Sequence, residues 1–312
     1  MDHAQLELSN NVTMLELFKK YIFVTKPGII VGNLITTAGG FFLASKGHVD
    51  NTILFSSLMG VSLVVASGCV FNNCIDRNMD RKMIRTKNRV LANGSMSLKA
   101  AIFYATLLSI VGTVLLWTST NKLCVAIVLT GFTIYVALYS LYLKRNSIYG
   151  ALVGCLAGAA PPLAGYCAVT ERFDMGALIL LSIFTLWQMP HCYAIAVYRI
   201  KDYAAAGIPI LPVKQGIPAA KRHITGYILA FSAATMMLTF AGYTGYNYLA
   251  VTMVMSLVWL RMAWTGFKTS RDRTWAKKLM IFSILTVTVL SFMMATDFTS
   301  KSSLGVLLTY VP

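Results

Sequence analysis

The chain alternates between long apolar stretches and short polar connections. A helix of about 20 apolar residues is long enough to cross the hydrocarbon core of a membrane. Nine stretches meet this length, with ends uncertain by several residues: 28–45, 52–72, 98–117, 122–142, 149–169, 175–197, 223–242, 246–265 and 276–296. Only 12% of the residues are charged, against about 25% in soluble domains. The pattern predicts an all-α polytopic membrane protein, a bundle of nine transmembrane helices.

The positive charge is unevenly divided between the two sides of this bundle. The net charge is +16. If the N-terminus is cytoplasmic, all but four of the 27 Lys and Arg residues face the cytoplasm; the exceptions are Lys46, Lys122, Arg172 and Lys301. An excess of cations on cytoplasmic loops is typical of membrane proteins. We therefore expect a cytoplasmic N-terminus, and the basic charge does not indicate a nucleic-acid partner.

Three regions are predicted along the chain. Residues 1–24 form a cytoplasmic N-terminal segment, residues 25–297 the intramembrane domain, and residues 298–312 a tail on the periplasmic side. The first segment lacks the apolar region of a secretory signal and contains acids that transit peptides avoid, which favours a bacterial inner membrane. The six cysteines include no CxxC pair and are expected to be small packing residues.

Proline and glycine interrupt the predicted helices at two places. The connection 198–222 contains "AGIPILPVKQGIP", which excludes a continuous helix. Pro161 and Pro162 are expected to break or kink the fifth span. The glycine-rich stretch 150–165 would permit close helix contact, with ordinary packing as the alternative explanation.

Asn72, Asp76 and Asp80 are spaced four residues apart at the end of the second span. This spacing places them on one helix face, where two carboxylates repel each other. The nearest cations, Arg77 and Arg81, point to a different face. Mg²⁺ binds one or two carboxylates together with phosphate oxygens and water, so the row predicts a metal site. An ordinary solvated helix end with salt bridges is the alternative.

Two groups of cations accompany the acidic row. Downstream of it lie Arg85, Lys87 and Arg89; at the end of the sixth span, on the same side, lie Arg199 and Lys201, with Asp202 beside them. Guanidinium groups bind diphosphate through paired hydrogen bonds, so these cations could close a site around that anion. Positive-inside anchoring of the helices is the alternative for the first group.

His191 is the one histidine inside a predicted span, about two to three turns deeper than this charged level. His223 stands at the boundary of the seventh span, and His3 and His48 lie outside the spans. It follows Pro190 and lies near Gln188. A lone buried histidine is usually a packing residue with a hydrogen bond. Beneath an ionic site in a cavity it could instead contact the substrate.

These segments resemble a known family. The pattern N-x3-D-x3-D at 72–80 resembles the first motif of the UbiA-type intramembrane prenyltransferase superfamily, which makes precursors of quinones, chlorophyll and haem O. Five segments in order resemble its haem O synthase branch: "VTKPGII", "NNCIDRNMDRKMIRTKNR", "GAAPPLAGY", "WQMPHCYAIA" and "YRIKDYAAAGIPILPV". The resemblance covers nearly the whole chain, from Thr25 to the end of the ninth span.

The resemblance implies a reaction and its partners. Farnesyl diphosphate is joined to a vinyl group of haem b, and water adds to leave a hydroxyethylfarnesyl side chain, which supplies terminal oxidases with haem. Mg²⁺ is the implied cofactor, membrane lipid surrounds the site, and a haem A synthase or a terminal-oxidase assembly is a candidate partner.

The resemblance also implies roles for individual residues. The positions that match are Asn72, Asp76 and Asp80 for Mg²⁺-diphosphate, Arg85 and Arg89 for the basic pair, Lys201 and Asp202 for the second motif, and His191 for haem. Tyr135, Tyr139 and Trp187 are candidates to steady an allylic cation with their ring faces, with packing as the alternative for each.

Two positions depart from the family pattern. Asn78 stands where this branch often has an aspartate, so that position cannot be an essential anionic ligand. Ala206 stands where the wider superfamily has a second acid after Asp202, which argues against a second Mg²⁺ held by paired acids.

Three other functions fit parts of this pattern. A carrier for an anionic solute would place its polar residues near the membrane midplane instead of at one face. A haem-ligating electron carrier needs axial histidines on facing helices, and one histidine within a span is too few. A prenyltransferase acting on a quinone ring would have the same site chemistry, and only the haem-branch segments distinguish it.

Overall fold

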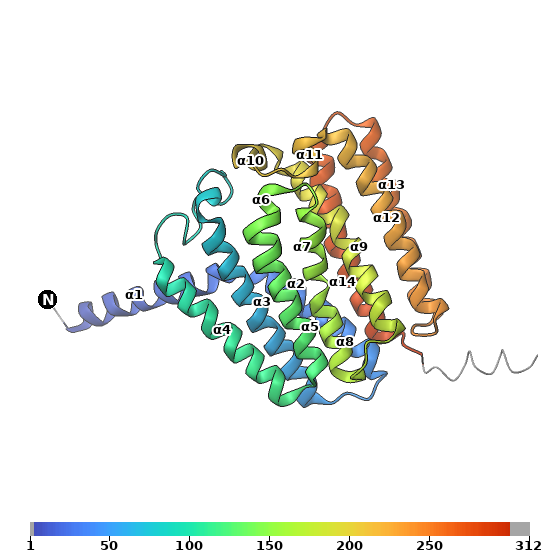
Figure 1. Ribbon diagram of the computed structural model, residues 1–312, viewed down its shortest axis with the longest axis horizontal. Coiled ribbons are helices and arrows are strands. Elements are labelled where there is room, and N and C mark those ends of the chain that lie inside the picture. Colours follow the sequence, from blue (N-terminus) through green and yellow to red (C-terminus); the bar gives the residue numbers. More distant parts are fainter. Residues whose placement is uncertain (1–2, 300–312) are drawn as a thin grey trace, which may run out of the picture.

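The computed structural model describes residues 3–299, with side chains from residue 14 onward. This part of the chain is helical and contains no strand beyond an isolated bridge between Thr244 and Phe298. The helices, labelled in Figure 1, are α1 (His3–Val24), α2 (Pro27–Ser45), α3 (Asn51–Asp80), α4 (Leu98–Ser119), α5 (Lys122–Thr133), η1 (Ile134–Leu143), α6 (Lys144–Asn146), α7 (Gly150–Gly158), α8 (Ala160–Thr170), α9 (Met175–Tyr198), α10 (Ile200–Ala205), α11 (Leu211–Lys214), α12 (Gly216–Phe240), α13 (Tyr246–Thr265), η2 (Gly266–Lys268) and α14 (Asp272–Thr296).

Nine segments of the described chain are long and apolar enough to cross a membrane, which confirms the predicted bundle. Four of them extend at least four residues beyond their predicted ends: α3 continues to Asp80, the fourth span continues to Asn146, α12 begins at Gly216 and α14 begins at Asp272. Polar residues at these helix ends lower the hydropathy but do not stop the helix. One correction follows: His223 lies within the seventh spanning helix, not at its boundary, so His191 is not the only histidine in a span.

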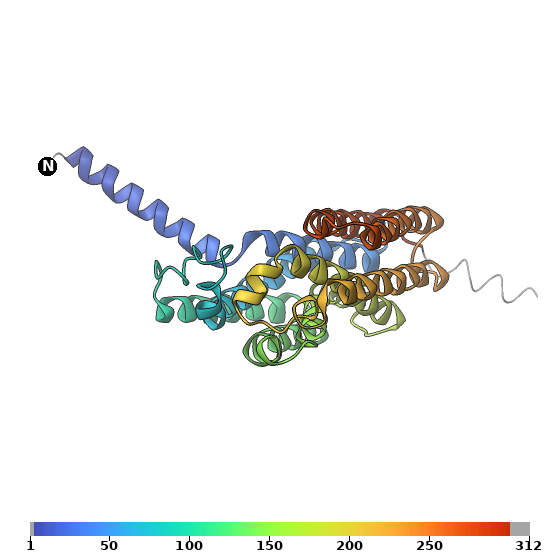
Figure 2. The ribbon, with the colours of Figure 1, turned by 90° about the horizontal axis from the view of Figure 1, so that it is seen from above.

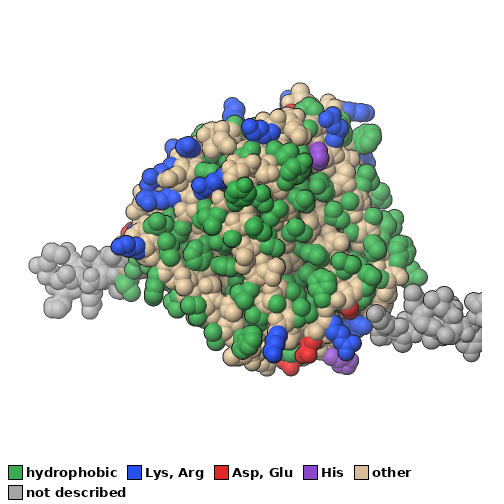
Figure 3. All heavy atoms as spheres, viewed as in Figure 1, with side chains coloured by type: hydrophobic (Ala, Val, Ile, Leu, Met, Phe, Trp, Pro, Cys, Tyr) green, Lys and Arg blue, Asp and Glu red, His purple; other side chains and the backbone are tan. Residues whose placement is uncertain are grey.

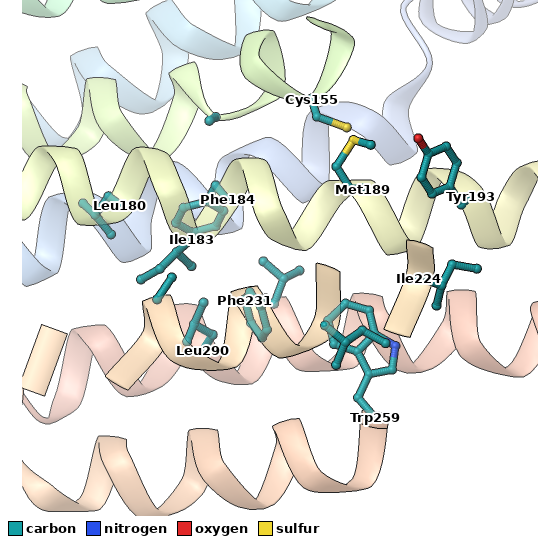
Figure 4. Packing of buried hydrophobic residues seen from close by; sticks show 14 of the residues in the cluster. Cys155, Leu180, Ile183, Phe184, Met189, Tyr193, Ile224, Phe231, Trp259 and Leu290 are labelled. Carbon is teal, nitrogen blue, oxygen red and sulfur yellow. The ribbon is translucent and has the colours of Figure 1, made fainter. Parts of the chain in front are cut away.

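The largest apolar core surrounds α9, which packs against α12 and α14. Figure 4 shows Phe184 of α9 facing this core, with Phe231 of α12 and Leu290 of α14 nearby. The rings of Phe231 and Trp259 meet edge to face with their centres 5.5 Å apart. In lipid, such helices are held together by close van der Waals packing, since lipid tails are as apolar as the side chains.

Glycines allow α2 and α8 to approach closely. A Cβ added at Gly40 of α2 would lie 2.1 Å from the carbonyl oxygen of Pro162, and one added at Gly165 of α8 would lie 2.1 Å from that of Thr37. The fifth span is also broken as predicted, because α7 ends at Gly158 and α8 begins at Ala160, immediately before the two prolines.

Both long polar connections lie at the same end of the bundle. The short helices α10 and α11 lie beyond the ends of α9 and α12, and the loop after α3 lies on the same side (Figure 1). Figure 3 shows Lys and Arg side chains gathered along this rim above a broad band of hydrophobic side chains. We call this end the basic rim. Its location agrees with the positive-inside argument, while the orientation in a membrane stays a prediction.

The N-terminal segment forms helix α1, which runs away from the bundle (Figure 2). It is joined to α4 by an edge-to-face contact between Tyr21 and Tyr104, with ring centres 4.9 Å apart. The predicted C-terminal tail, 298–312, lies outside the described residues except for Phe298 and Thr299. The cytoplasmic and periplasmic assignments of these two segments stay predictions.

Candidate active site

The last turns of α3 carry a buried row of polar side chains. Asn72, Asp76 and Asp80 are each exposed by no more than 3%. Arg77 and Arg81 turn away from this row and donate to the carbonyl oxygens of Leu91 and Ala92 in the following loop. The predicted common face of the three residues is therefore present, with the arginines on another face.

Cations from other parts of the chain neutralise the row. Lys26 donates to the Asn72 side-chain oxygen at 2.6 Å, and Lys144 donates to Asp76 Oδ2. Arg89 forms an ion pair with Asp80 at 3.0 Å. Of these three cations, only Arg89 was predicted as part of the site.

The other two cations were missed because their partners are distant in sequence. Lys144 and its neighbour Arg145, whose Nη2 lies 3.8 Å from Asp76 Oδ1, were interpreted only as positive-inside charges. Lys26 stands in the segment "VTKPGII", which resembles the haem O synthase branch. That resemblance was the one sequence feature that could have indicated a role for Lys26 in the site.

A π-helix brings Lys144 to Asp76. Residues Ile134–Leu143 form η1, and Ser140 Oγ, which donates to the Tyr135 carbonyl five residues earlier, accepts a hydrogen bond from Asn72. A π-helix has more residues per turn than the about 3.6 of an α-helix. Tyr135 and Lys144 would point in opposite directions on an α-helix, whereas the wider turn places them on one face. The π-helix therefore directs Lys144 toward Asp76.

Lys26 has an unusual backbone and an unusual environment. Its φ of 58° lies in the left-handed region, which is uncommon for a residue other than glycine. Burial, reinforced by the neighbouring charges of Arg89 and Lys144, lowers the pKa of the Lys26 amine to about 8. The amine can thus lose its proton near physiological pH unless an anion binds it.

Asp202 and its neighbours are arranged differently from the prediction. The buried Asp202 carboxylate accepts a hydrogen bond of 3.0 Å from the backbone N–H of Ile84 and, among the described residues, makes no hydrogen bond or ion pair with the acidic row of α3. This hydrogen bond links α10 to the loop after α3. The predicted role of Asp202 at the diphosphate stays a prediction.

The remaining predicted cations lie at the periphery. Arg199 stacks over the ring of Tyr198 at 4.4 Å, while Lys87 and Lys201 are exposed and contact neither carboxylate of α3. Arg85 is exposed as well, but its charge acts on Tyr203, which lines the cavity described next. Within the described chain, the cations beside the row are therefore Lys26, Lys144 and Arg89, with Arg145 more distant at 3.8 Å.

An apolar cavity of about 560 Å³ begins directly inside the acidic row. Its wall includes Cys69 of α3, one turn before Asn72, and Tyr203 beside Asp202. The aromatic candidates Tyr135, Tyr139 and Trp187 all line it. A volume between about 300 and 1,000 Å³ is usual for sites that bind small organic molecules. The polar row therefore lies next to this cavity, one helical turn beyond Cys69, although none of its own side chains is part of the cavity wall.

His191 lines the same cavity and is fixed from behind. Its Nδ1 lies 2.6 Å from Ser283 Oγ of α14, and the ring stacks on Trp187 with centres 5.2 Å apart. The indole of Trp187 donates to the Ser283 carbonyl at 2.8 Å. His223 contacts the ring of Tyr193 instead and is not part of the cavity wall.

The acidic row has the chemistry of a shared metal site. Among the described side chains, no three His, Cys, Asp or Glu residues are placed to hold a metal on their own. Asp76 Oδ1, however, is buried and has no hydrogen-bond partner. One or two carboxylates plus an amide oxygen fit Mg²⁺ when phosphate oxygens and water complete its shell. The residues present therefore suit a metal that arrives with a phosphate ligand.

This fold and site define an intramembrane prenyltransferase. Residues 33–285 match the UbiA prenyltransferase family, and the chain belongs to this family. Similar relatives include protoheme IX farnesyltransferase 2 of Pseudomonas fluorescens strain Pf0-1, which is 60% identical over 94% of this chain and 99% of its own length. The protoheme IX farnesyltransferase of Edwardsiella ictaluri is 58% identical over 95% of this chain and its full length.

Solved structures share the fold at low sequence identity. A digeranylgeranylglyceryl phosphate synthase matches with a TM-score of 0.74 at 19% identity, covering 90% of this chain and 98% of its own. A UbiA homologue of Archaeoglobus fulgidus, solved with GPP and Mg²⁺ bound, matches with a TM-score of 0.68 at 14% identity, covering 89% of this chain and 99% of its own. These matches confirm the predicted all-helical intramembrane fold.

Proposed function

We propose that this protein transfers the farnesyl group of farnesyl diphosphate to a vinyl group of haem b and so makes haem O. The observation that carries this proposal is the near-full-length identity of 60% to a protoheme IX farnesyltransferase. The geometry agrees with it, because a charged row suited to diphosphate lies next to an apolar cavity suited to an isoprenoid and a porphyrin.

The diphosphate binds at the end of α3. Asp76 and Asp80, with Asn72, would hold Mg²⁺, and bound Mg²⁺ would supply charge neutralisation for the departing diphosphate. Arg89 and Lys144 now pair with the two carboxylates at the same place. With the carboxylates holding Mg²⁺, Arg89 and Lys144 would be free to bind phosphate oxygens. The cations that would bind the diphosphate are thus already at the site, paired with Asp76 and Asp80.

The cavity below the row protects the reactive intermediate. Loss of diphosphate leaves an allylic cation that water would capture. The apolar cavity wall excludes water. The rings of Tyr135 and Tyr139, which stack with their centres 5.8 Å apart, can stabilise positive charge through their faces. An electron-rich vinyl group held in the same chamber can then reach the cation first.

Haem b would occupy the deeper part of this chamber, near His191 and Trp187. The protein would work in a bacterial inner membrane with the basic rim toward the cytoplasm, because the cations gather at that end. Haem O is consumed by enzymes that modify haem or assemble oxidases, so a haem A synthase or a terminal-oxidase assembly is the partner we propose.

The test is conversion of haem b by purified protein in lipid. With farnesyl diphosphate and Mg²⁺, mass spectrometry should detect haem O, EDTA should stop its formation, and added Mg²⁺ should restore it. Supplying 4-hydroxybenzoate in parallel distinguishes a quinone-ring prenyltransferase. Prenylation of that ring without haem O would overturn the proposal.

A matched pair of variants tests the metal site. Asp76→Asn removes a charge from the row and should lower turnover by at least about 100-fold, since positioned charges at the leaving group contribute about 10²–10³. Asp50→Asn, which alters only the N-cap at the other end of α3, should keep wild-type turnover. Equal activity of the two variants would remove the argument from the acidic row.

A further inference from the structure

The proposed reaction needs one water molecule inside a cavity that otherwise has to exclude water. Haem O carries a hydroxyl group that haem b lacks, so water must add to the former vinyl group after the new carbon–carbon bond forms. Water that reached the allylic cation first would hydrolyse the isoprenoid instead. A single water held at a fixed place, away from the diphosphate, satisfies both demands. Buried waters of this kind have about three polar partners.

Gln188 of α9 offers one such partner. The side chain is half-buried and lines the cavity. Its Nε2 donates to the carbonyl oxygen of Phe184 at 3.2 Å, and because a carbonyl can only accept, this bond identifies which end of the amide is the nitrogen. Among the described residues, no group donates a hydrogen bond to the amide oxygen Oε1. Oε1 is therefore an oriented, unused acceptor in a largely apolar wall.

The backbone carbonyl of Gly158 offers a second partner. Gly158 is the last residue of α7 and also lines the cavity. The residues three and four positions later are Pro161 and Pro162, which have no N–H, so neither a 3₁₀ nor an α-helical hydrogen bond can reach this carbonyl. No other backbone N–H of the described chain donates to it. Such irregular backbone is tolerated within a membrane where it lines a cavity.

The two acceptors lie side by side. A Cβ added at Gly158 would lie 2.0 Å from Oε1 of Gln188, so the amide oxygen rests directly against this glycine. Any larger residue at position 158 would displace the amide. The break between α7 and α8 and the glutamine of α9 thus place two oxygen acceptors at one point of the cavity wall.

This point is far from the acidic row. The first residue of α7, Gly150, packs against the Leu143–Lys144 peptide, and Lys144 is the cation that pairs with Asp76. Gly158 lies about two helical turns further along α7, or roughly 12 Å. A cation that forms beside the diphosphate would therefore meet a vinyl group in the cavity before it could meet a water held at Gly158.

We propose that Gln188 Oε1 and the Gly158 carbonyl hold the water that adds to the vinyl group of haem b. The inference rests on the proposed function for the identity of the substrate and the product. Each acceptor takes one proton of the water in a hydrogen bond, which leaves an oxygen lone pair facing the cavity. Gln188 is thus a positioning residue that acts through the water.

The held water acts after the carbon–carbon bond has formed. The electron pair of the vinyl double bond joins its terminal carbon to the first carbon of the farnesyl cation, and the positive charge moves to the carbon attached to the porphyrin. A lone pair of the water forms a bond to that carbon. The proton that the water then loses passes to the diphosphate, the base that the reaction itself releases. Without the water, the same cation would lose a proton from the adjoining CH₂ group and form a double bond.

The test is the identity of the product formed by full-length protein in lipid with haem b, farnesyl diphosphate and Mg²⁺. Mass spectrometry distinguishes haem O from its dehydrated counterpart, because the two differ by one water. Gln188→Leu removes the acceptor and should lower the ratio of hydroxylated to dehydrated product about 10-fold, as expected for one lost hydrogen bond. Gln188→Glu keeps an acceptor oxygen and should retain the wild-type ratio.

Two further variants complete the comparison. Gln215→Leu changes an exposed glutamine that is not part of the cavity wall and should leave the ratio unchanged. Pro162→Ala introduces an N–H four residues beyond Gly158, which can bond the freed carbonyl, and should lower the ratio as Gln188→Leu does. A merely structural defect would lower the yield of both products together, whereas loss of the held water changes their ratio.

The outcomes separate this inference from the proposed function. If the wild type makes haem O and Gln188→Leu makes it with an unchanged ratio, the inference is wrong and the proposed function stands. If the wild type prenylates no haem, the proposed function is wrong and the inference falls with it. Should Gln188→Leu fail to fold, Pro162→Ala decides the question, since an unchanged ratio in that variant overturns the inference.

Discussion

Asp76 uses only one of its carboxylate oxygens for hydrogen bonds. Oδ2 accepts from Asn72 at 2.8 Å and from Lys144, while the buried Oδ1 has no hydrogen bond. Its nearest cation is Arg145, whose Nη2 lies 3.8 Å away, too far for a hydrogen bond. A buried charged oxygen that lacks a hydrogen bond costs about 1–3 kcal/mol or more. Such an oxygen is commonly kept for a ligand, and at this position the ligand we propose is a metal ion that accompanies diphosphate.

We predict that Lys26 makes the reaction sensitive to alkaline pH. Its pKa of about 8 means that the amine loses its charge as the pH rises above that value. Only the charged amine attracts diphosphate, so kcat/KM should be constant below about pH 7 and fall as the pH passes about 8. Lys26→Arg should move this decline to higher pH, because arginine stays protonated to above about pH 12.

The pH dependence of kcat/KM in lipid checks this prediction. Lys19→Arg, an exposed lysine of α1, is the matched control and should leave the profile unchanged. A profile that is identical in wild type and Lys26→Arg would mean that the lysine does not hold the diphosphate.

Single residues differ in how well the sequence predicts their roles. Asn72, Asp76 and Asp80 follow from their spacing alone, since a regular helix repeats nearly every four residues. The sequence did not predict that Lys144 lies at the site. On a regular α-helix it would point away from Tyr135, which lines the cavity, and only the π-helix brings the two residues to one face. Ser283 lies far from His191 in sequence, and nothing in its apolar surroundings distinguishes it from other serines in the ninth span.

At the scale of elements, the packing of α2 on α8 depends on the absence of side chains. Gly40→Ala would place a Cβ 2.1 Å from a backbone carbonyl that cannot move independently of its helix. Overpacking of this kind costs about 1–3 kcal/mol. The variant should therefore unfold in detergent at a temperature several degrees lower than the wild type.

Gly32→Ala on the same helix is the control for this prediction. A Cβ at Gly32 meets nothing within 4 Å, and alanine is a better helix former than glycine. Its thermal midpoint, measured by fluorescence-detected size-exclusion chromatography, should equal or exceed that of the wild type. Equal losses in the two variants would show that helix propensity or lipid contact, rather than close packing, sets the stability.

Elements were predicted well where hydropathy decides them and poorly where hydrogen bonding does. The nine spans follow from the lengths of the apolar runs, and the break at Pro161 follows from its missing N–H. The π-helix at 134–143 has no such signal, because its residues are as apolar as those of any spanning helix. It depends on tertiary contacts, among them the bond from Asn72 to Ser140.

At the scale of the whole molecule, the basic rim predicts the orientation in the membrane. With the rim toward the cytoplasm, Lys87 would lie inside the cell and Lys46, between α2 and α3, outside. In cells with a permeabilised outer membrane, a membrane-impermeant maleimide should label Lys46→Cys directly and Lys87→Cys only after lysis. The unsubstituted protein corrects for labelling of its own cysteines. The reverse labelling pattern would overturn the predicted topology.

Each carboxylate of the acidic row is paired with a cation of the chain, and this affects how the protein can fold in the cell. Lys144 and Arg89 compensate Asp76 and Asp80 without a metal or a substrate. A newly synthesised chain can therefore complete its folding before magnesium or isoprenoid reaches it. Cells starved of magnesium or isoprenoid should therefore contain as much folded protein in the membrane as unstarved cells, although that protein would be inactive.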